Sequence, residues 1–148
     1  MPTIDVAVTG GGPMRTIMWR AQTTDATPIL LPWVNLPSTG SGAWFNSNIT
    51  AQQSNADRGF GRTDVGQVNR NSIGVGFGNT IAVGSNGYTD TVATPWTTGG
   101  TPAGWGAQPY DLSASPIVQF GLVGAAGQTT DWLFVVDVYL WGGAILLV

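Results

Sequence analysis

The sequence predicts an all-β protein: an antiparallel β-sandwich or jelly-roll-like single domain with an extended N-terminal arm or loops. Three observations support this prediction. The chain has about eight strand-like stretches, turn-forming residues separate them, and no stretch has a helical period. Its 148 residues are enough for one domain with a sizeable core, so we expect a single sandwich domain over residues 1–148.

The strand around which the others are organised is expected at 130–141, TDWLFVVDVYLW. Alternate residues are apolar on both of its faces and many are β-branched or aromatic, which is typical of a strand covered on both sides. At about 3.3 Å per residue it would run roughly 35 to 40 Å. The apolar run continues to Val148, but it is short for a membrane span and is interrupted by Asp137 and two glycines, so we expect no membrane segment.

Shorter patterns predict the other strands. Ile4 to Val8 alternates and predicts a half-buried first strand that stops at the glycines and proline of 10–13. Residues 14–22 predict a second strand covered on both faces at its middle, because three large apolar residues are consecutive there. Further strands are expected at 43–53, 73–78, 80–83, 88–93 and 117–123, with a hairpin turn at Asn86-Gly87.

Residues 23–42 form a proline-rich segment, interrupted by Pro28, Pro32 and Pro37. Because proline cannot donate a ladder hydrogen bond, this segment predicts an extended edge segment or arm rather than a central strand. It either reaches onto a neighbouring subunit or packs as a surface loop on its own domain. Its candidate inter-subunit contacts are Ile29, Leu31, Trp33 and Leu36.

The densest charged segment is 57–64, DRGFGRTD, with a further arginine shortly after it. One interpretation is a docking loop, in which arginines pair with carboxylates of a partner and a phenylalanine is the apolar anchor. The other is pairing of Asp and Arg within the loop itself. The candidate contacts are Arg58, Phe60, Arg62 and Arg70. Asp57 and Asp64 lack the spacing of a calcium loop, so we expect no metal.

Composition limits the partners. Only 9% of residues are charged, every cation is Arg and every acid is Asp. Lys and Glu, which freely exposed surfaces use most, are absent, so we expect part of the surface to be hidden by other subunits and the rest to be solvated by Thr, Ser, Asn and Gln. A net charge of −3 argues against binding nucleic acid, which depends on clustered Lys and Arg.

No catalytic or cofactor site is expected. His, Cys, Lys and Glu are absent, so the usual general bases and activated nucleophiles are missing, and the eight acidic residues are scattered singly. Gly74, Gly76 and Gly78 are spaced like part of a nucleotide loop, but a strand-like run follows them where a phosphate-binding helix would begin. The N-terminus lacks the basic and apolar regions of a signal peptide, so we expect a cytoplasmic site of synthesis.

Two further features have alternative interpretations. Asp137 stands among apolar residues, so we expect a buried carboxylate that meets an arginine, a tyrosine hydroxyl or backbone donors at a subunit boundary; the alternative is a partly solvated face. Trp96 and Trp105 lie in a segment rich in Gly, Thr and Pro. They form either a stacking platform for sugars or anchors of a core or interface.

This profile resembles the decoration or cement proteins of tailed-bacteriophage capsids. The shared characters are a short acidic chain without Cys or His, strands rich in Gly, Thr and Asn, prolines from Pro28 to Pro37, and an apolar strand near the C-terminus. The resemblance implies a β-sandwich or jelly-roll-like subunit that forms a homo-oligomer, with a trimer favoured. It also implies a place on the outer surface of the virion, where the subunit would bind the major capsid protein.

Two other functions remain as alternatives. The first is another structural part of a virion, such as a tail, collar or fibre-tip module. The second is a lectin-like domain that binds carbohydrate. In each case we expect a protein without enzymatic activity, cofactor or metal, which acts through surface contacts alone.

Overall fold

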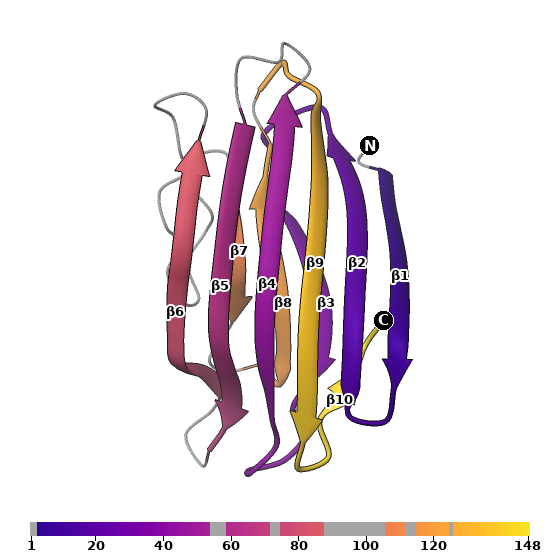
Figure 1. Ribbon diagram of the computed structural model, residues 1–148, viewed down its shortest axis with the longest axis vertical. Helices are drawn as coiled ribbons and strands as arrows, with labels where there is room; N and C mark the ends of the chain where they lie inside the picture. The colour runs from indigo at the N-terminus through magenta and orange to yellow at the C-terminus, as the bar shows by residue number, and fades with distance from the viewer. Residues whose placement is uncertain (1–2, 54–58, 72–74, 88–105, 112–114, 125) are drawn as a thin grey trace.

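The computed structural model describes residues 3–53, 59–71, 75–87, 106–111, 115–124 and 126–148. These residues contain ten strands and no helix, and they form two antiparallel sheets packed face to face (Figure 1). The all-β sandwich predicted from the sequence is therefore confirmed.

The larger sheet has six strands and the smaller has four. In spatial order the six-stranded sheet contains β1 (Thr3–Gly11), β2 (Met14–Thr23), β9 (Thr130–Trp141), β4 (Gly42–Gln53), β5 (Gly59–Arg70) and β6 (Val75–Gly87). The four-stranded sheet contains β10 (Ile145–Leu146), β3 (Ile29–Asn35), β8 (Ile117–Val123) and β7 (Gly106–Asp111).

Two of the strand pairs are nested along the chain. β2 pairs with β9 in the larger sheet, while β3 and β8, which lie between them in the sequence, pair in the smaller one. The chain crosses to the smaller sheet at β3, returns to the larger sheet for β4, β5 and β6, and crosses again at β7, β9 and β10. β9 lies between β2 and β4 and pairs with β4 along its whole length, so it is the central strand that the sequence predicted.

The core lies between the two sheets and is built from alternate residues of facing strands. Phe120 of β8 occupies its centre. Its ring lies edge-on to Trp19 at a centroid distance of 5.8 Å and stacks on Trp33 at 5.7 Å. Phe45 and Phe134 meet the same ring edge-on at 6.2 and 6.1 Å. These five core rings join β2, β4 and β9 to the smaller sheet, because each ring belongs to a different strand.

The proline-rich segment is not an arm. Its residues 29–35 form β3, which pairs with β8 on one side and with the short β10 on the other. Leu31, Trp33 and Leu36 are buried in the core of their own subunit, so the prediction of inter-subunit contacts for these side chains is wrong for the folded chain. Pro32 is exposed and lies at a register shift, where the regular ladder is already interrupted; a proline is therefore tolerated there.

Three expectations about strand coverage and turns are also wrong. β2 and β9 are covered on one face only, because a single sheet packs against the six-stranded sheet. The described side chains of β1 are all exposed, although half-burial was expected. Residues 75–87 form one continuous strand, so the predicted turn at Asn86-Gly87 lies within β6, while 88–93 falls outside the described residues.

Candidate interaction surface on the six-stranded sheet

Among the described residues, no second layer lies over the outward face of the six-stranded sheet. The strand registers fix which side chains are neighbours there. Met14, Tyr139 and Trp44 form one row across β2, β9 and β4. Thr16, Asp137 and Asn46 form the next row, followed by Met18, Val135 and Asn48. The result is a flat surface that is aromatic at one end, polar in its middle and charged at its other end.

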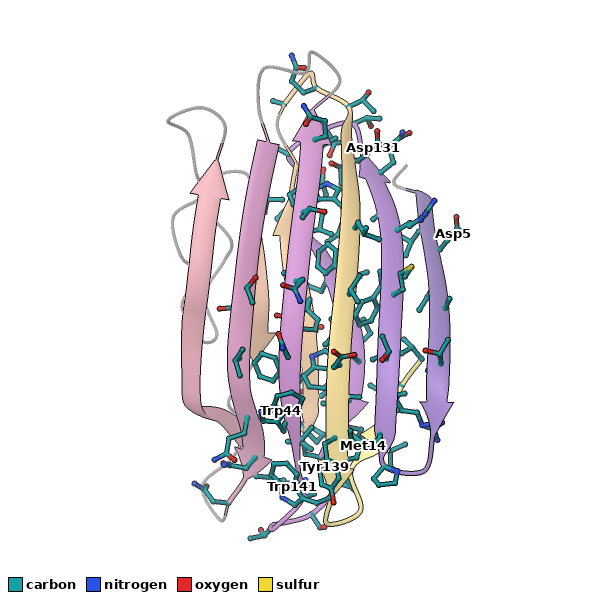
Figure 2. All side chains as sticks on the ribbon, in the orientation of Figure 1. Asp5, Met14, Trp44, Asp131, Tyr139 and Trp141 are labelled. Carbon is teal, nitrogen blue, oxygen red and sulfur yellow. The ribbon has the colours of Figure 1, made fainter. Side chains whose placement is uncertain are left out.

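The aromatic end is a cluster of Met14, Trp44, Tyr139 and Trp141, which Figure 2 shows gathered at one end of β2, β4 and β9. Met14 is 55% exposed, Tyr139 43% and Trp44 37%, large fractions for side chains of this size. The rings of Tyr139 and Trp141 are tilted by 36° with centroids 6.4 Å apart. We call these four residues the aromatic cluster.

Gly42 makes room for the aromatic cluster. It is opposite Trp141 in the β4–β9 register, and a Cβ atom added to it would collide with the indole ring of Trp141. Gly42 itself is buried, while Trp141 is half-buried. The indole can therefore lie across the backbone of β4 only because the residue beneath it has no side chain.

Two hydrogen bonds lie in neighbouring rows at the middle of the surface. Thr16 Oγ1 donates to Asp137 Oδ1 at 2.7 Å, and Thr63 Oγ1 donates to Asn48 Oδ1 at 2.8 Å. Asn46 lies beside Asp137, and its buried Oδ1 has no hydrogen-bond partner among the described residues. The exposed carboxylate of Asp137 is therefore the group of this row that a covering molecule would meet.

Asp137 is exposed, which corrects the expectation of a buried carboxylate. The expectation followed from its apolar neighbours in the sequence, Val136 and Val138, but these two side chains point into the core on the opposite face of the strand. Its partner is the Thr16 hydroxyl and not an arginine or a tyrosine. The alternative of a solvated face is the one that the structure supports.

The other end of the surface is hollowed and charged. A shallow hollow of about 600 Å³ is lined by residues of β1, β2, β4 and β9, among them Asp5, Arg20, Gln22 and Asp131. Gln22 Nε2 donates to Asp131 Oδ1 at 2.8 Å, and Arg20 lies opposite Asp5 in the β1–β2 register. Figure 2 shows Asp5 and Asp131 at the end of the sheet away from the aromatic cluster.

The arginine segment does not form the docking loop that the sequence suggested, because residues 59–70 are strand β5, paired along β4. Arg70 Nη1 donates to the backbone oxygen of Leu36 at 2.9 Å, so these two predicted residues do meet, but within one subunit. Ile29 is partly buried and packs against the core. Arg58 and the side chains of Phe60 and Arg62 lie outside the described part of the chain, as do Trp96 and Trp105.

The sequence analysis did not identify the aromatic cluster as a surface. The signal was present in the apolar residues on both faces of 130–141, but it was interpreted as a sign of burial. Among the residues that the structure describes, no three acidic, His or Cys side chains are placed to hold a metal ion. The described residues also include no helix long and apolar enough to cross a bilayer.

Comparison of the chain with known protein families, with curated proteins and with solved structures finds no match in any of the three.

Proposed function

We propose that this chain is a non-enzymatic structural protein of a virion, a decoration or cement protein that binds the outer shell of a tailed-bacteriophage capsid. One observation carries the proposal: the outward face of the six-stranded sheet exposes Met14, Trp44 and Tyr139 beside a short polar row. Aromatic residues and methionine are enriched where proteins meet, and charged residues are depleted there.

The three parts of this face have separate roles in the proposed contact. The aromatic cluster supplies apolar area that loses its water when the capsid surface covers it. The row of Thr16, Asp137 and Asn46 sets the register, since a partner must satisfy the exposed carboxylate of Asp137. The charged end steers the approach, but contributes less once bound, because exposed charges are screened by salt.

Stabilisation of the shell follows from mass action. A protein that binds the assembled shell, and not its separate capsomers, shifts the equilibrium towards the assembled state. The proposed partners are a second copy of the chain and the major capsid protein. The net charge of −3 suits a position outside the shell, because a protein lining the genome would be expected to present a basic face.

The location is tested by electron microscopy. Gold-labelled recombinant protein is added to particles of the phage whose genome encodes this chain. The particles are then imaged in negative stain. We expect label over the shell. Label confined to the tail, collar or fibre tip would contradict the decoration function and favour the alternative of another virion part.

The contact face is tested with two matched double variants. Trp44→Ser with Tyr139→Ser removes apolar area from the outward face of the six-stranded sheet. Leu30→Ser with Ile117→Ser removes similarly exposed side chains from the four-stranded sheet. We expect the first pair to weaken binding to shells at least tenfold and the second to leave it unchanged, with both proteins melting near the wild-type temperature. Equal losses in the two variants would contradict the assignment of the face.

Carbohydrate binding is a second candidate function, and the aromatic cluster is the observation that favours it. Exposed indole and phenol rings beside amide and carboxylate groups suit a sugar, which stacks its apolar face and hydrogen-bonds its hydroxyls. A glycan array probed with the wild-type protein tests this function. A glycan retained by the wild type and lost by Trp44→Ala would favour carbohydrate binding over shell binding.

A further inference from the structure

The described edges of the two sheets differ in how they are protected from pairing with another chain. β10 is two residues long, and β7 carries Pro109, so both edges of the four-stranded sheet are poor templates. The six-stranded sheet ends in two longer strands, β1 of nine residues and β6 of thirteen, and neither contains proline. β1 is therefore a long edge without the usual protection.

β1 also exposes apolar side chains towards the core side of the sheet. Val6 lies opposite Trp19 and Val8 opposite Ile17, which places both on the inward face. Yet Ile4, Val6 and Val8 are 42%, 49% and 36% exposed. Among the described residues, the smaller sheet therefore leaves the inward face of β1 largely uncovered.

The exposed apolar row of Ile4, Val6 and Val8 is continuous with a second apolar region. Val8 lines a hollow of about 600 Å³ together with Leu146 and Val148 from the C-terminal segment. Leu146 packs against the core, whereas Val148 is 38% exposed. The side of the sandwich next to β1 thus leaves part of the hydrophobic layer open, beside a row of unpaired backbone groups.

We propose that a second copy of the chain covers this edge. The two β1 strands pair antiparallel about a two-fold axis at Ala7, so that two six-stranded sheets become one continuous sheet. Ala7 is the midpoint of Thr3–Gly11, and this register pairs every residue of the strand. Val6 then lies opposite the partner's Val8, so apolar residues meet on the inward face.

Charge disfavours the registers with the axis at Val6 or Asp5, and an axis at Val8 would leave the first residues of the strand unpaired. With the axis at Ala7, Asp5 lies opposite the partner's Thr9, whose hydroxyl is a donor for the carboxylate. The two Asp5 residues are then separated by four positions along the strand, about 14 Å, which exceeds the screening length of about 8 Å. With the axis at Val6 the carboxylates become diagonal neighbours, about 7 to 8 Å apart, and with the axis at Asp5 they face each other.

An axis between two residues is excluded by the pleat. Such a register would pair odd-numbered with even-numbered residues and bring Val6 next to an outward-facing residue of the partner. The size of the contact is also modest. A seam of nine residue pairs, about 30 Å long, is expected to bury less area than a standard interface of about 800 Å² per partner, so we expect the dimer to form reversibly, with a dissociation constant on the order of micromolar or weaker.

A single cysteine tests the register. The chain has no cysteine, so any disulfide in the variant Ala7→Cys must join two copies. We expect Ala7→Cys to give a covalent dimer under mild oxidation, because residues paired on the axis lie within disulfide range. The matched control is Thr9→Cys, whose two copies would lie about 14 Å apart, beyond the reach of a disulfide. Equal cross-linking of both variants, or none for Ala7→Cys, would overturn the proposal.

Sedimentation measures the association without a covalent bond. Wild type is expected to shift from monomer to dimer between micromolar and submillimolar concentrations. Val6→Lys places a charge in the seam and is expected to abolish the shift, while Leu30→Lys, at a similarly exposed position on the other sheet, keeps it. A wild type that stays monomeric, or a Val6→Lys variant that still dimerises, overturns the proposal. Circular dichroism verifies that both variants are folded.

This inference does not depend on the proposed function, because it rests on the edge strand and not on the outward face. The two therefore fail separately: loss of shell binding in the Trp44 and Tyr139 variant leaves the Ala7→Cys cross-link intact. A trimeric mass without the Ala7→Cys cross-link would exclude the two-fold seam and favour the trimer that the resemblance implies.

Discussion

The two faces of β9 are built from similar residues but have different environments. On the inward face Trp132, Phe134 and Val136 are almost completely buried. On the outward face Val135 is half-buried, while Asp137 and Tyr139 are exposed. Hydropathy along a strand therefore does not show how many layers cover it. An apolar face without a second layer is expected to be covered by another molecule.

The hydrogen bonds of the two faces differ in the same way. Trp132 Nε1 donates to Thr23 Oγ1 at 3.0 Å in the buried layer. Thr16 donates to Asp137 at 2.7 Å on the exposed face. Water can replace the second bond but not the first, so the loss of each should have a different cost.

The largest difference between the faces is expected for their aromatic residues. Phe134→Ala leaves a cavity beside Trp19 and Phe120 and should lower the free energy of unfolding by about 3 to 5 kcal/mol. Tyr139→Ala on the outward face should cost less than about 1 kcal/mol. Urea unfolding followed by tryptophan fluorescence measures both. A comparable loss for Tyr139→Ala would mean that the outward face is packed within the subunit.

Val135 and Val136 allow the same substitution to be compared on the two faces of β9. Val136→Ala removes two methyl groups from the dry face and should cost about 2 kcal/mol, including the cavity. Val135→Ala makes the same change on the half-covered face and should cost about 0.5 kcal/mol. Urea midpoints at equal slope compare the variants directly. Equal costs would remove the distinction between the two faces at the middle of the strand.

The hydrogen-bonding threonines sharpen the comparison. Thr23→Val leaves the buried indole N–H of Trp132 without this acceptor and should cost about 1 to 2 kcal/mol. Thr16→Val frees Asp137 to bind water and should cost less than about 0.5 kcal/mol. Thermal melts of the two variants decide the order. If Thr16→Val proved the more damaging, the outward row would be a structural element of the subunit.

The smallest effect is expected at an exposed turn outside both faces. The Thr27 backbone N–H donates to Asp25 Oδ1 at 2.8 Å, which lowers the pKa of that carboxyl below its ordinary value of 3.8. A lowered pKa stabilises the folded state above the unfolded-state pKa, and the contribution is lost as the pH falls through the folded-state pKa. The stability difference between wild type and Asp25→Ala should thus be small at pH 7 and vanish in acid. A difference that persists below the folded-state pKa would contradict this origin.

Local pattern predicted the regular strands well. The predicted ranges 130–141 and 117–123 coincide with β9 and β8. Long runs of β-branched and aromatic residues favour a strand, and neither run has a helical period. The prediction for β3 failed because the rule that proline interrupts a strand was applied to each proline without regard to the partner strand. Pro32 lies at a register shift, and such a shift depends on the partner strand β8 and not on the residue itself.

The candidate site was predicted less well than the fold. Leu31, Trp33 and Leu36 were expected at an interface because they lie between prolines, yet they supply the core of the subunit. The aromatic cluster was not foreseen, since Met14, Trp44 and Tyr139 are far apart in the sequence and become neighbours only through the registers of β2, β9 and β4. These strand registers cannot be predicted from any local sequence pattern.

The sequence by itself determined that this protein is a β-sandwich with few charges and without His, Cys, Lys or Glu, since strand periodicity and composition are properties of the chain. Only the tertiary structure decided which apolar faces are covered. Burial depends on whether a second layer lies over a strand, and a strand of period two looks alike in both cases. The outward face of β9 is open because a single sheet packs against the six-stranded sheet, whereas the inward side of β1 is open because that second sheet is narrower, with four strands.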